Sequence, residues 1–384
     1  MDISEDILYI GAQDEDLDLF ESQYPVPNGM TYNSYVILDE KVAVTDTADA
    51  RKLDEWMENL EEALSGRTPD YLIIHHMEPD HSAGILMMAE KYPELKIVGN
   101  AKTFPMITAF LGEDLAGRGI VVKEGEELSL GRHTLTFVMA PMIHWPEVMF
   151  SYEKTEQVLF SADAFGSFGT IEKQEEDWYC EGRRYYFNIV GKYGAQVQAA
   201  LKKLSALPVR AIAPLHGPVH FEPAPVIERY GVWSRYEPED RGVTICCAGV
   251  HGNTLEAARM LGEMLTAEGI KVKLFDLTRD DMSEAMEDCF RYDRLVLAAT
   301  TYDGDLFPVM HDLIYHLKMK NYQNRTVGII ENGSWAPQSG KKMREGLEGL
   351  KNITVLEPVV TLKSAVSAQS QAQLEALAAA LAQA

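Results

Sequence analysis

The chain has 384 residues, a length typical of two domains, and its 46% hydrophobic and 24% charged residues are typical of a soluble globular protein. The formal net charge of −24 argues against a nucleic-acid-binding role, because binding to phosphates requires Lys and Arg. No apolar run reaches the roughly 18 residues of a membrane span, and the acidic start MDISEDILYI does not resemble a signal peptide, so we expect a cytoplasmic protein.

The first part of the chain alternates short apolar runs with turns and with helical patterns. Helices are expected at 50–64 and 193–204. This mixture predicts an α/β domain with many short strands, at 35–38, 42–44, 71–74, 97–98, 134–138, 158–160 and 209–213.

A polar, proline-containing segment at 233–241 separates this part from a more regular one. We therefore place a domain boundary near residue 238 and expect domains at 1–238 and 239–384. The second domain has the βαβ rhythm of a doubly wound parallel sheet. Its expected strands are 243–247, 271–275, 294–299, 326–330 and 353–356, and its expected helices are 254–267, 308–319, 339–349 and a terminal Ala-rich helix within 367–384.

The four cysteines include no CxxC pair, which argues against a zinc ribbon, a rubredoxin-type iron site and a disulfide framework. Cys246 and Cys247 lie in an apolar strand pattern and are interpreted as core residues. Five histidines outside the motifs below are interpreted as structural: His75, His133, His220, His311 and His316.

Potential metal ligands follow the strands of the first domain where those strands end. Four of them, His76, Glu78, Asp80 and His81, follow strand 71–74, and the others are His144, Asp163 and His216. Loops at strand ends converge at one edge of a layered fold, so these side chains are expected to meet. Four imidazoles and three carboxylates without a thiolate favour iron, although ligand type alone leaves zinc open.

This ordered set of ligands resembles the di-iron signature of the flavodiiron proteins, also called A-type flavoproteins. The flanking segments VPNGMTYNSY, HWPE, DAFG and HGP are similar to that family as well, and the resemblance covers essentially the whole chain. It implies a metallo-β-lactamase-like αββα sandwich followed by a flavodoxin-like domain. The related zinc hydrolases have His where this chain has Glu78, which also favours iron.

The resemblance implies a role for each ligand. His76, Glu78 and His144 would hold one iron, Asp80, His81 and His216 would hold the second, and Asp163 would bridge the two. In that family the residue equivalent to His81 does not bind metal in every member.

Three loops of the second domain are expected to bind FMN. The first follows strand 243–247 and opens a helix, where free N–H groups and the helix dipole favour a phosphate. The other two carry the aromatic residues Tyr302 and Trp335, the expected flanks of the flavin ring. The resemblance to flavodoxin implies contacts from Gly249, Val250, His251, Gly252, Asn253, Thr254, Thr301, Tyr302, Asp303, Gly304, Asn332, Gly333, Ser334 and Trp335.

Gly249 departs from the flavodoxin pattern, because the family's phosphate loop usually begins with a Ser or Thr hydroxyl. One phosphate contact is therefore missing, and we expect FMN binding to persist, with weaker affinity. The resemblance also implies reduction of O2 to water, of NO to N2O, or of both. It further implies a head-to-tail homodimer or dimer of dimers and a separate electron donor, rubredoxin or a similar small protein.

Two other functions stay open at this level. A zinc hydrolase fused to a flavodoxin domain would use the same ligand positions, and Glu78 argues against it. The alternative is an electron carrier with a purely structural metal site. Its flavin would become reduced but would not be rapidly reoxidised by O2 or NO.

Overall fold

The computed structural model describes residues 2–173 and 178–384 and divides into two compact units, 1–231 and 232–384. The division falls within helix α7, Pro223–Ser234. Across the described part of the chain, no helix combines the length and the apolar character that crossing a membrane requires.

The first unit contains a six-stranded sheet in the order β1-β6-β7-β8-β9-β10. The strands from β7 to β10 run parallel, whereas β1, β6 and β7 pair antiparallel. The bounds are β1 Ile7–Tyr9, β6 Tyr35–Ile37, β7 Ala43–Thr45, β8 Tyr71–Ile73, β9 Lys96–Gly99 and β10 Gly119–Val121.

A second sheet of five strands follows the order β11-β12-β13-β14-β15, antiparallel except for the last pair. The bounds are β11 Glu127–Ser129, β12 Thr134–Met139, β13 Met149–Glu153, β14 Val158–Phe160 and β15 Ala211–Ala213. Two short ribbons complete the unit: β2 Ala12–Asp14 with β5 Met30–Tyr32, and β3 Leu19–Phe20 with β4 Tyr24–Pro25.

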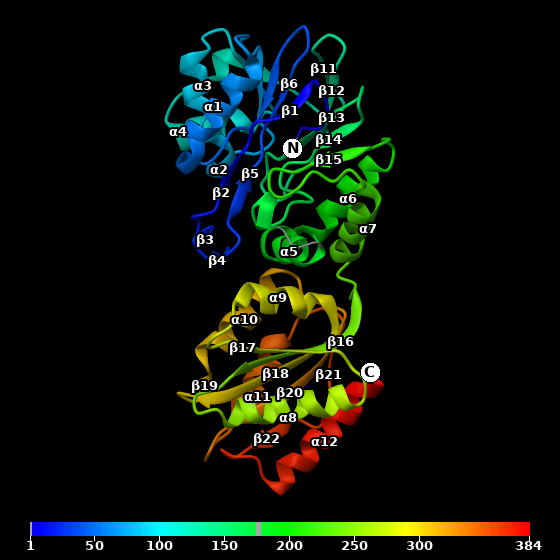
Figure 1. The fold of residues 1–384 in the computed structure, drawn as a ribbon. Helices are drawn as coiled ribbons and strands as arrows, with labels where there is room; N and C mark the ends of the chain where they lie inside the picture. The colour runs from blue at the N-terminus through cyan, green and yellow to red at the C-terminus, as the bar shows by residue number, and fades with distance from the viewer. Residues whose placement is uncertain (1, 174–177) are drawn as a thin grey trace. The chain divides into compact units, whose positions relative to one another are not determined.

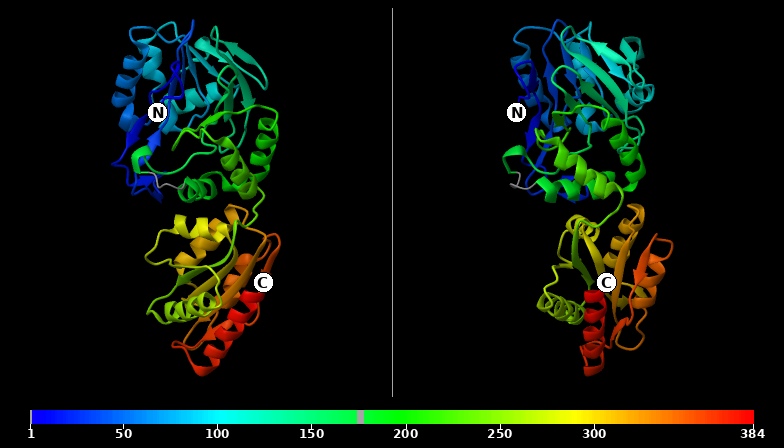
Figure 2. Two further views of the ribbon diagram at one scale, coloured as in Figure 1. Left: turned by 45° about the vertical axis from the view of Figure 1, so that its right-hand side comes forward. Right: turned by 90° about the vertical axis from the view of Figure 1, so that its right-hand side faces the viewer.

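The core of this unit lies between the two sheets. Ile37 and Ile73 of the first sheet pack in one cluster with Phe137 and Phe160 of the second. Helices cover the outer faces, as Figures 1 and 2 show, and this arrangement confirms the predicted αββα sandwich. The helices are η1 Ala50–Lys52, α1 Leu53–Leu64, α2 Pro79–Ser82, α3 Ile85–Lys91, α4 Thr103–Leu111, η2 Ala116–Arg118, η3 Ile171–Lys173, α5 Trp178–Tyr185, η4 Tyr186–Val190, η5 Gly191–Tyr193, α6 Gly194–Leu204 and α7.

The second unit contains a parallel sheet in the order β17-β16-β18-β20-β21, with β22 parallel to β20 and β19 antiparallel to β18. This order, in which the first strand lies between the second and the third, is that of flavodoxin-like folds, as predicted. The bounds are β16 Asp240–Ala248, β17 Val272–Asp276, β18 Tyr292–Tyr302, β19 Asp305–Leu306, β20 Arg325–Asn332, β21 Ile353–Val355 and β22 Val360–Leu362.

Alternate residues of β16 face opposite sides of this sheet. Ile245 and Cys247 pack against α8 and α12, while Cys246 lies 3.7 Å from Cys289 of α9, Sγ to Sγ. Helices therefore cover both faces. They are α8 Asn253–Ala267, α9 Met282–Arg291, α10 Pro308–Met319, α11 Ser339–Leu347 and α12 Ala368–Gln383.

The predicted strands and helices are all present, with ends shifted by at most three residues, but many other elements were not predicted, among them β1 to β5, β10, β11, β13, β19 and β22 and the helices α2 to α5, α7 and α9. The α9 sequence, MSEAMEDCFR, places the buried residues Ala285, Met286, Cys289 and Phe290 along one side, and the side chain of Asp281 caps the helix. This spacing is typical of a surface helix, so α9 could have been predicted from the sequence.

Candidate functional site

The seven residues predicted as metal ligands lie in four loops at one edge of the first unit. His76 and Glu78 follow β8, and Asp80 and His81 lie in the short helix α2. His144 lies between β12 and β13, Asp163 follows β14 and His216 follows β15. The structure brings all seven together in two groups, each of which could hold a metal ion.

The first group contains His76, Glu78, His144 and Asp163. The His76 and His144 Nε2 atoms lie 3.1 and 3.0 Å from Glu78 Oε2. His144 Nε2 is also 3.0 Å from Asp163 Oδ2. Two imidazole nitrogens and two carboxylate oxygens therefore face one point.

The second group contains Asp80, His81 and His216. The Nε2 atoms of the two histidines are 3.0 Å apart, and they lie 3.4 and 3.3 Å from Asp80 Oδ2. Asp163 lies between the groups, because its Oδ1 is 3.5 Å from His81 Nε2 while its Oδ2 faces the first group.

Several buried polar atoms of these groups lack a hydrogen-bond partner among the described residues. They are both carboxylate oxygens of Asp80, Oδ1 of Asp163 and Nδ1 of His81. Buried carboxylates without partners are costly unless a cation compensates them. The donor set therefore fits metal cations.

Electrostatics in the groups lead to the same conclusion. Burial disfavours the charged forms, yet Asp163 and Glu78 raise the pKa of His144 to about 9. Burial is likewise outweighed at Asp163, where His76, His144 and His81 hold the pKa of the carboxyl well below its ordinary range. The carboxylate ligands thus require positive charge beside them. Without metal, protonated histidines supply this charge. When metal ions bind, they displace those protons and supply the charge instead.

A second layer of contacts orients the imidazoles. Glu147 Oε1 lies 2.8 Å from His76 Nδ1 and accepts the Met77 N–H at 2.9 Å, and the Thr31 carbonyl lies 2.6 Å from His216 Nδ1. Each bond assigns the Nδ1 hydrogen to the outer partner and leaves Nε2 free to bind a metal. Glu147 and Thr31 were not predicted for this role, although both lie in segments that resemble the family.

Aromatic residues enclose the second group. The rings of Phe20, Tyr32 and Tyr185 contact the His216 ring at centroid distances of 5.3, 6.3 and 5.6 Å. The Tyr185 hydroxyl is buried and has no hydrogen-bond partner among the described residues. Burial first, and then Asp163, Asp80 and Glu78, raise its pKa well above the usual value, so the hydroxyl stays protonated.

The five histidines interpreted as structural stay outside both groups. His75 is buried between Asp46 and Ser151, and His220 lies 2.9 Å from the Phe165 carbonyl. His133 forms a further cluster with Asp6 and Glu156, in which the guanidinium of Arg132 already pairs with the carboxylates. The other two, His311 and His316, lie on α10.

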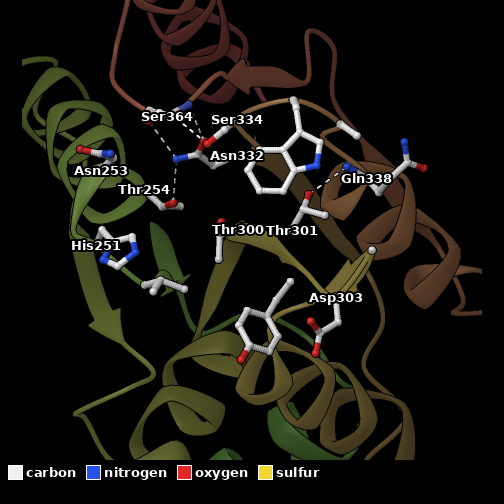
Figure 3. A pocket seen from close by; sticks show the side chains of 16 residues that line it. His251, Asn253, Thr254, Thr300, Thr301, Asp303, Asn332, Ser334, Gln338 and Ser364 are labelled. Atoms are coloured by element: carbon white, nitrogen blue, oxygen red, sulfur yellow. Dashed lines mark hydrogen bonds between the residues drawn. The ribbon is translucent and has the colours of Figure 1, made fainter.

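The second unit has a cavity of about 540 Å³ at the carboxyl ends of its strands, shown in Figure 3. Twelve of the predicted FMN contacts line it, and Gly249 and Gly252 do not. Gly252 instead opens α8 with a φ of +87°, a conformation that favours glycine. Four further residues line the cavity and were not predicted as contacts: Thr300, Ala336, Gln338 and Ser364.

Comparison with known proteins agrees with this geometry. Residues 30–217 match the family model described as ODP family beta lactamase. The coenzyme F420H2 oxidase of Methanothermobacter marburgensis is 30% identical over 346 residues, which cover 85% of this chain and 83% of that protein. The nitric oxide reductase of Moorella thermoacetica is 27% identical over 94% of this chain and 92% of its own length.

Among solved structures, the rubredoxin oxygen:oxidoreductase of Desulfovibrio gigas matches with a TM-score of 0.93 and 26% identity, covering 100% of this chain and 98% of that one. Other matching structures are named as flavodiiron proteins. The chain belongs to the flavodiiron protein family. The predicted resemblance is thereby confirmed, and the match to flavodiiron structures includes both units, because it spans the full chain.

Proposed function

We propose that this flavodiiron protein reduces O2 to water, NO to N2O, or both, at a di-iron site that receives electrons from FMN. The observation that carries the proposal is the pair of ligand groups with Asp163 between them. The relatives support it, since their names include an oxygen oxidoreductase and a nitric oxide reductase.

In this proposal His76, Glu78 and His144 hold one iron, and Asp80, His81 and His216 hold the other. Asp163 bridges them, because its two oxygens face different groups. The position of His81 Nε2 beside His216 Nε2 and Asp80 supports His81 as a ligand. When bound, the two irons and FMN supply the stored electrons that four-electron reduction of O2, or two-electron reduction of two NO, requires.

The chain's own residues supply orientation, exclusion of water and a hydrogen-bond donor. Glu147 and Thr31 fix the imidazoles of His76 and His216. The rings of Phe20 and Tyr32 limit water around the second group. The Tyr185 hydroxyl is the hydrogen-bond donor of the site in this proposal, because it is protonated, buried and near the carboxylate ligands. A donor at this position can give a hydrogen bond to the gas as it is reduced.

FMN binds in the cavity of the second unit, with Tyr302 and Trp335 beside its ring. We assign 1–238 to the di-iron domain and 239–384 to the FMN domain. A head-to-tail homodimer or dimer of dimers in the cytoplasm, with rubredoxin or a similar small protein as electron donor, completes the proposal.

The experiment is anaerobic stopped-flow reoxidation of the reduced protein by O2 and by NO, with metal analysis of the same sample. Two irons per chain and fast reoxidation by at least one gas are expected. Asp163→Ala should abolish gas reduction and keep bound FMN. Zinc in place of iron, or a reduced protein that neither gas reoxidises, would contradict the proposal.

Tyr185→Phe tests the hydrogen-bond donor in the same assay. The turnover number should fall by about a hundredfold, while metal content stays unchanged. Tyr35→Phe is the matched control, because its hydroxyl is also buried without a partner among the described residues but lies in the core between the sheets. Equal turnover in the two variants would exclude a role for Tyr185.

A further inference from the structure

The cavity of the second unit has a hydroxyl-rich side to which a fourth segment contributes. Ser364 lies between β22 and α12, outside the three predicted loops, and lines the cavity with Ser334. The two Oγ atoms are 2.6 Å apart. Figure 3 shows Ser334, Ser364, Asn332 and Thr254 gathered at one side of the cavity.

The buried side-chain amide of Asn332 connects the residues on this side of the cavity by hydrogen bonds. Asn332 Nδ2 donates to Thr254 Oγ1 at 3.2 Å and to the Ser364 carbonyl at 3.0 Å, and Oδ1 accepts the Ser364 N–H at 3.0 Å. Ser364 has a φ of +75°, in the left-handed region that non-glycine residues seldom occupy. Backbone strain of this kind persists where the surrounding contacts fix it, and such positions are frequent at ligand sites.

Some hydroxyl hydrogens on this side of the cavity are not used in the hydrogen bonds among these residues and could be donated to a ligand. An amide nitrogen only donates, so Thr254 accepts from Asn332 and keeps its own hydroxyl hydrogen available. In the Ser334–Ser364 pair one hydroxyl donates to the other, which leaves the second hydrogen available. The first N–H groups of α8, which begins at Asn253, add further donors next to Thr254.

These free donors select an anionic acceptor. The residues lining the cavity include no Lys or Arg, so neutral hydroxyl and N–H groups and the dipole of α8 must provide the attraction. A phosphate group matches this set of donors, because all of its outer oxygens accept hydrogen bonds.

We propose that the Ser334–Ser364 pair, held in place by Asn332, binds the FMN phosphate together with Thr254 and the start of α8. The pair replaces the hydroxyl that position 249 lacks. A Cβ added at Gly249 would lie 3.1 Å from Thr254 Cβ, so this loop has little room for a serine there. The inference rests on the proposed function, in which FMN is the ligand of this cavity.

The test compares FMN with riboflavin, which lacks the phosphate, by calorimetric titration of the full-length chain freed of flavin. Ser364→Gly removes the hydroxyl, and glycine accepts a φ of +75° without strain. Its Kd for FMN should rise about tenfold, the loss expected for one hydrogen bond to a charged acceptor. Its Kd for riboflavin should stay unchanged, which also shows that the variant is folded.

Three other variants sharpen the result. Ser334→Ala should also weaken FMN binding, and the double variant should lose more affinity than either single variant, because after one substitution the remaining hydroxyl still has a hydrogen to donate. Gly249→Ser should weaken FMN binding rather than strengthen it, because of the crowding at Thr254. Thr354→Val, which removes an exposed hydroxyl on β21, is the control and should bind both flavins normally.

An unchanged FMN Kd in Ser364→Gly would overturn the inference, and so would an equal loss of FMN and riboflavin affinity. A Gly249→Ser variant that binds FMN more tightly would also overturn it, since the missing hydroxyl would then not have been replaced. Unmodified protein that binds neither flavin would instead overturn the proposed FMN site, and the inference with it.

Discussion

Asp163 illustrates how much single residues decide in this protein. Its two carboxylate oxygens face different groups of ligands, with His144 Nε2 at 3.0 Å from one and His81 Nε2 at 3.5 Å from the other. The buried carboxylate is stabilised in its charged form by His76, His144 and His81, which lower its pKa. A neutral side chain at this position would remove both the bridge and the charge that attracts the metals.

His220 determines part of the pH dependence of stability. Burial lowers its pKa to about 4, and only the hydrogen bond to the Phe165 carbonyl acts in the opposite direction. In the unfolded chain the pKa of His is about 6.5. Below that pH, His220 therefore binds a proton in the unfolded state but stays neutral in the folded state until the pH approaches 4. The stability contribution is present above about pH 6.5 and is lost as the pH falls toward 4.

We predict that this residue accounts for about 2 kcal/mol of the stability lost between pH 7 and pH 5. His220→Gln keeps a hydrogen-bond donor for Phe165 and does not titrate in this range. Urea unfolding of both proteins at the two pH values measures the difference. If both proteins lose the same free energy of unfolding, burial of a neutral His220 is not the cause.

At the scale of elements, the segment from β8 to α2 depends on a residue from another loop. Asp46, between β7 and η1, is fully buried and has a φ of +50°. Its Oδ1 accepts the backbone N–H groups of His75 and His76 at 2.8 and 3.3 Å, and its Oδ2 lies 2.6 Å from His75 Nδ1. Asp46 therefore sets the path of the chain that presents the first ligand.

We predict that Asp46→Ala lowers the free energy of unfolding by about 3 kcal/mol, because it leaves buried N–H groups without an acceptor. The variant should also retain less iron after dialysis. Chemical unfolding and metal analysis measure the two effects, and Asp54→Ala, an exposed site on α1, is the control. An Asp46→Ala protein with normal stability and full iron would show that the segment holds its path without this residue.

For the whole molecule, each unit has its own core and its own candidate site. The metal-ligand groups belong to the unit 1–231 and the cavity belongs to 232–384. A ligand stabilises the folded state to which it binds. We therefore predict that iron removal increases amide hydrogen exchange in peptides from the first unit and that FMN removal increases it in peptides from the second.

Hydrogen-exchange mass spectrometry of the loaded, iron-free and flavin-free protein measures these changes peptide by peptide. The peptides that contain Asp163 and Ser364 are the most informative for the two sites. A uniform increase across the chain after removal of either ligand would show that the two units do not respond separately.

Apolar runs of fixed spacing predicted a mixed α/β first domain, a doubly wound second domain and about half of the strands, whereas the αββα sandwich was implied by the resemblance to flavodiiron proteins. Sequence patterns also singled out all seven metal-ligand candidates, since His and carboxylates directly after such runs are unusual. Sequence analysis missed α9, although its apolar residues have helical spacing, and it missed Ser364, whose segment shows no glycine-rich or aromatic pattern.

Tertiary structure decided what local pattern cannot contain: which distant atoms meet. The contact of the Tyr185 ring with His216, the hydrogen bonds from the His75 and His76 backbone to Asp46 and those between Asn332 and Ser364 all join residues far apart in the chain. The residue types and their order thus determined the two folds and the chemistry of the ligands. Only the folded arrangement of the loops at the sheet edges fixed the distances between ligand atoms on which binding depends, because side-chain contacts act over a few ångströms.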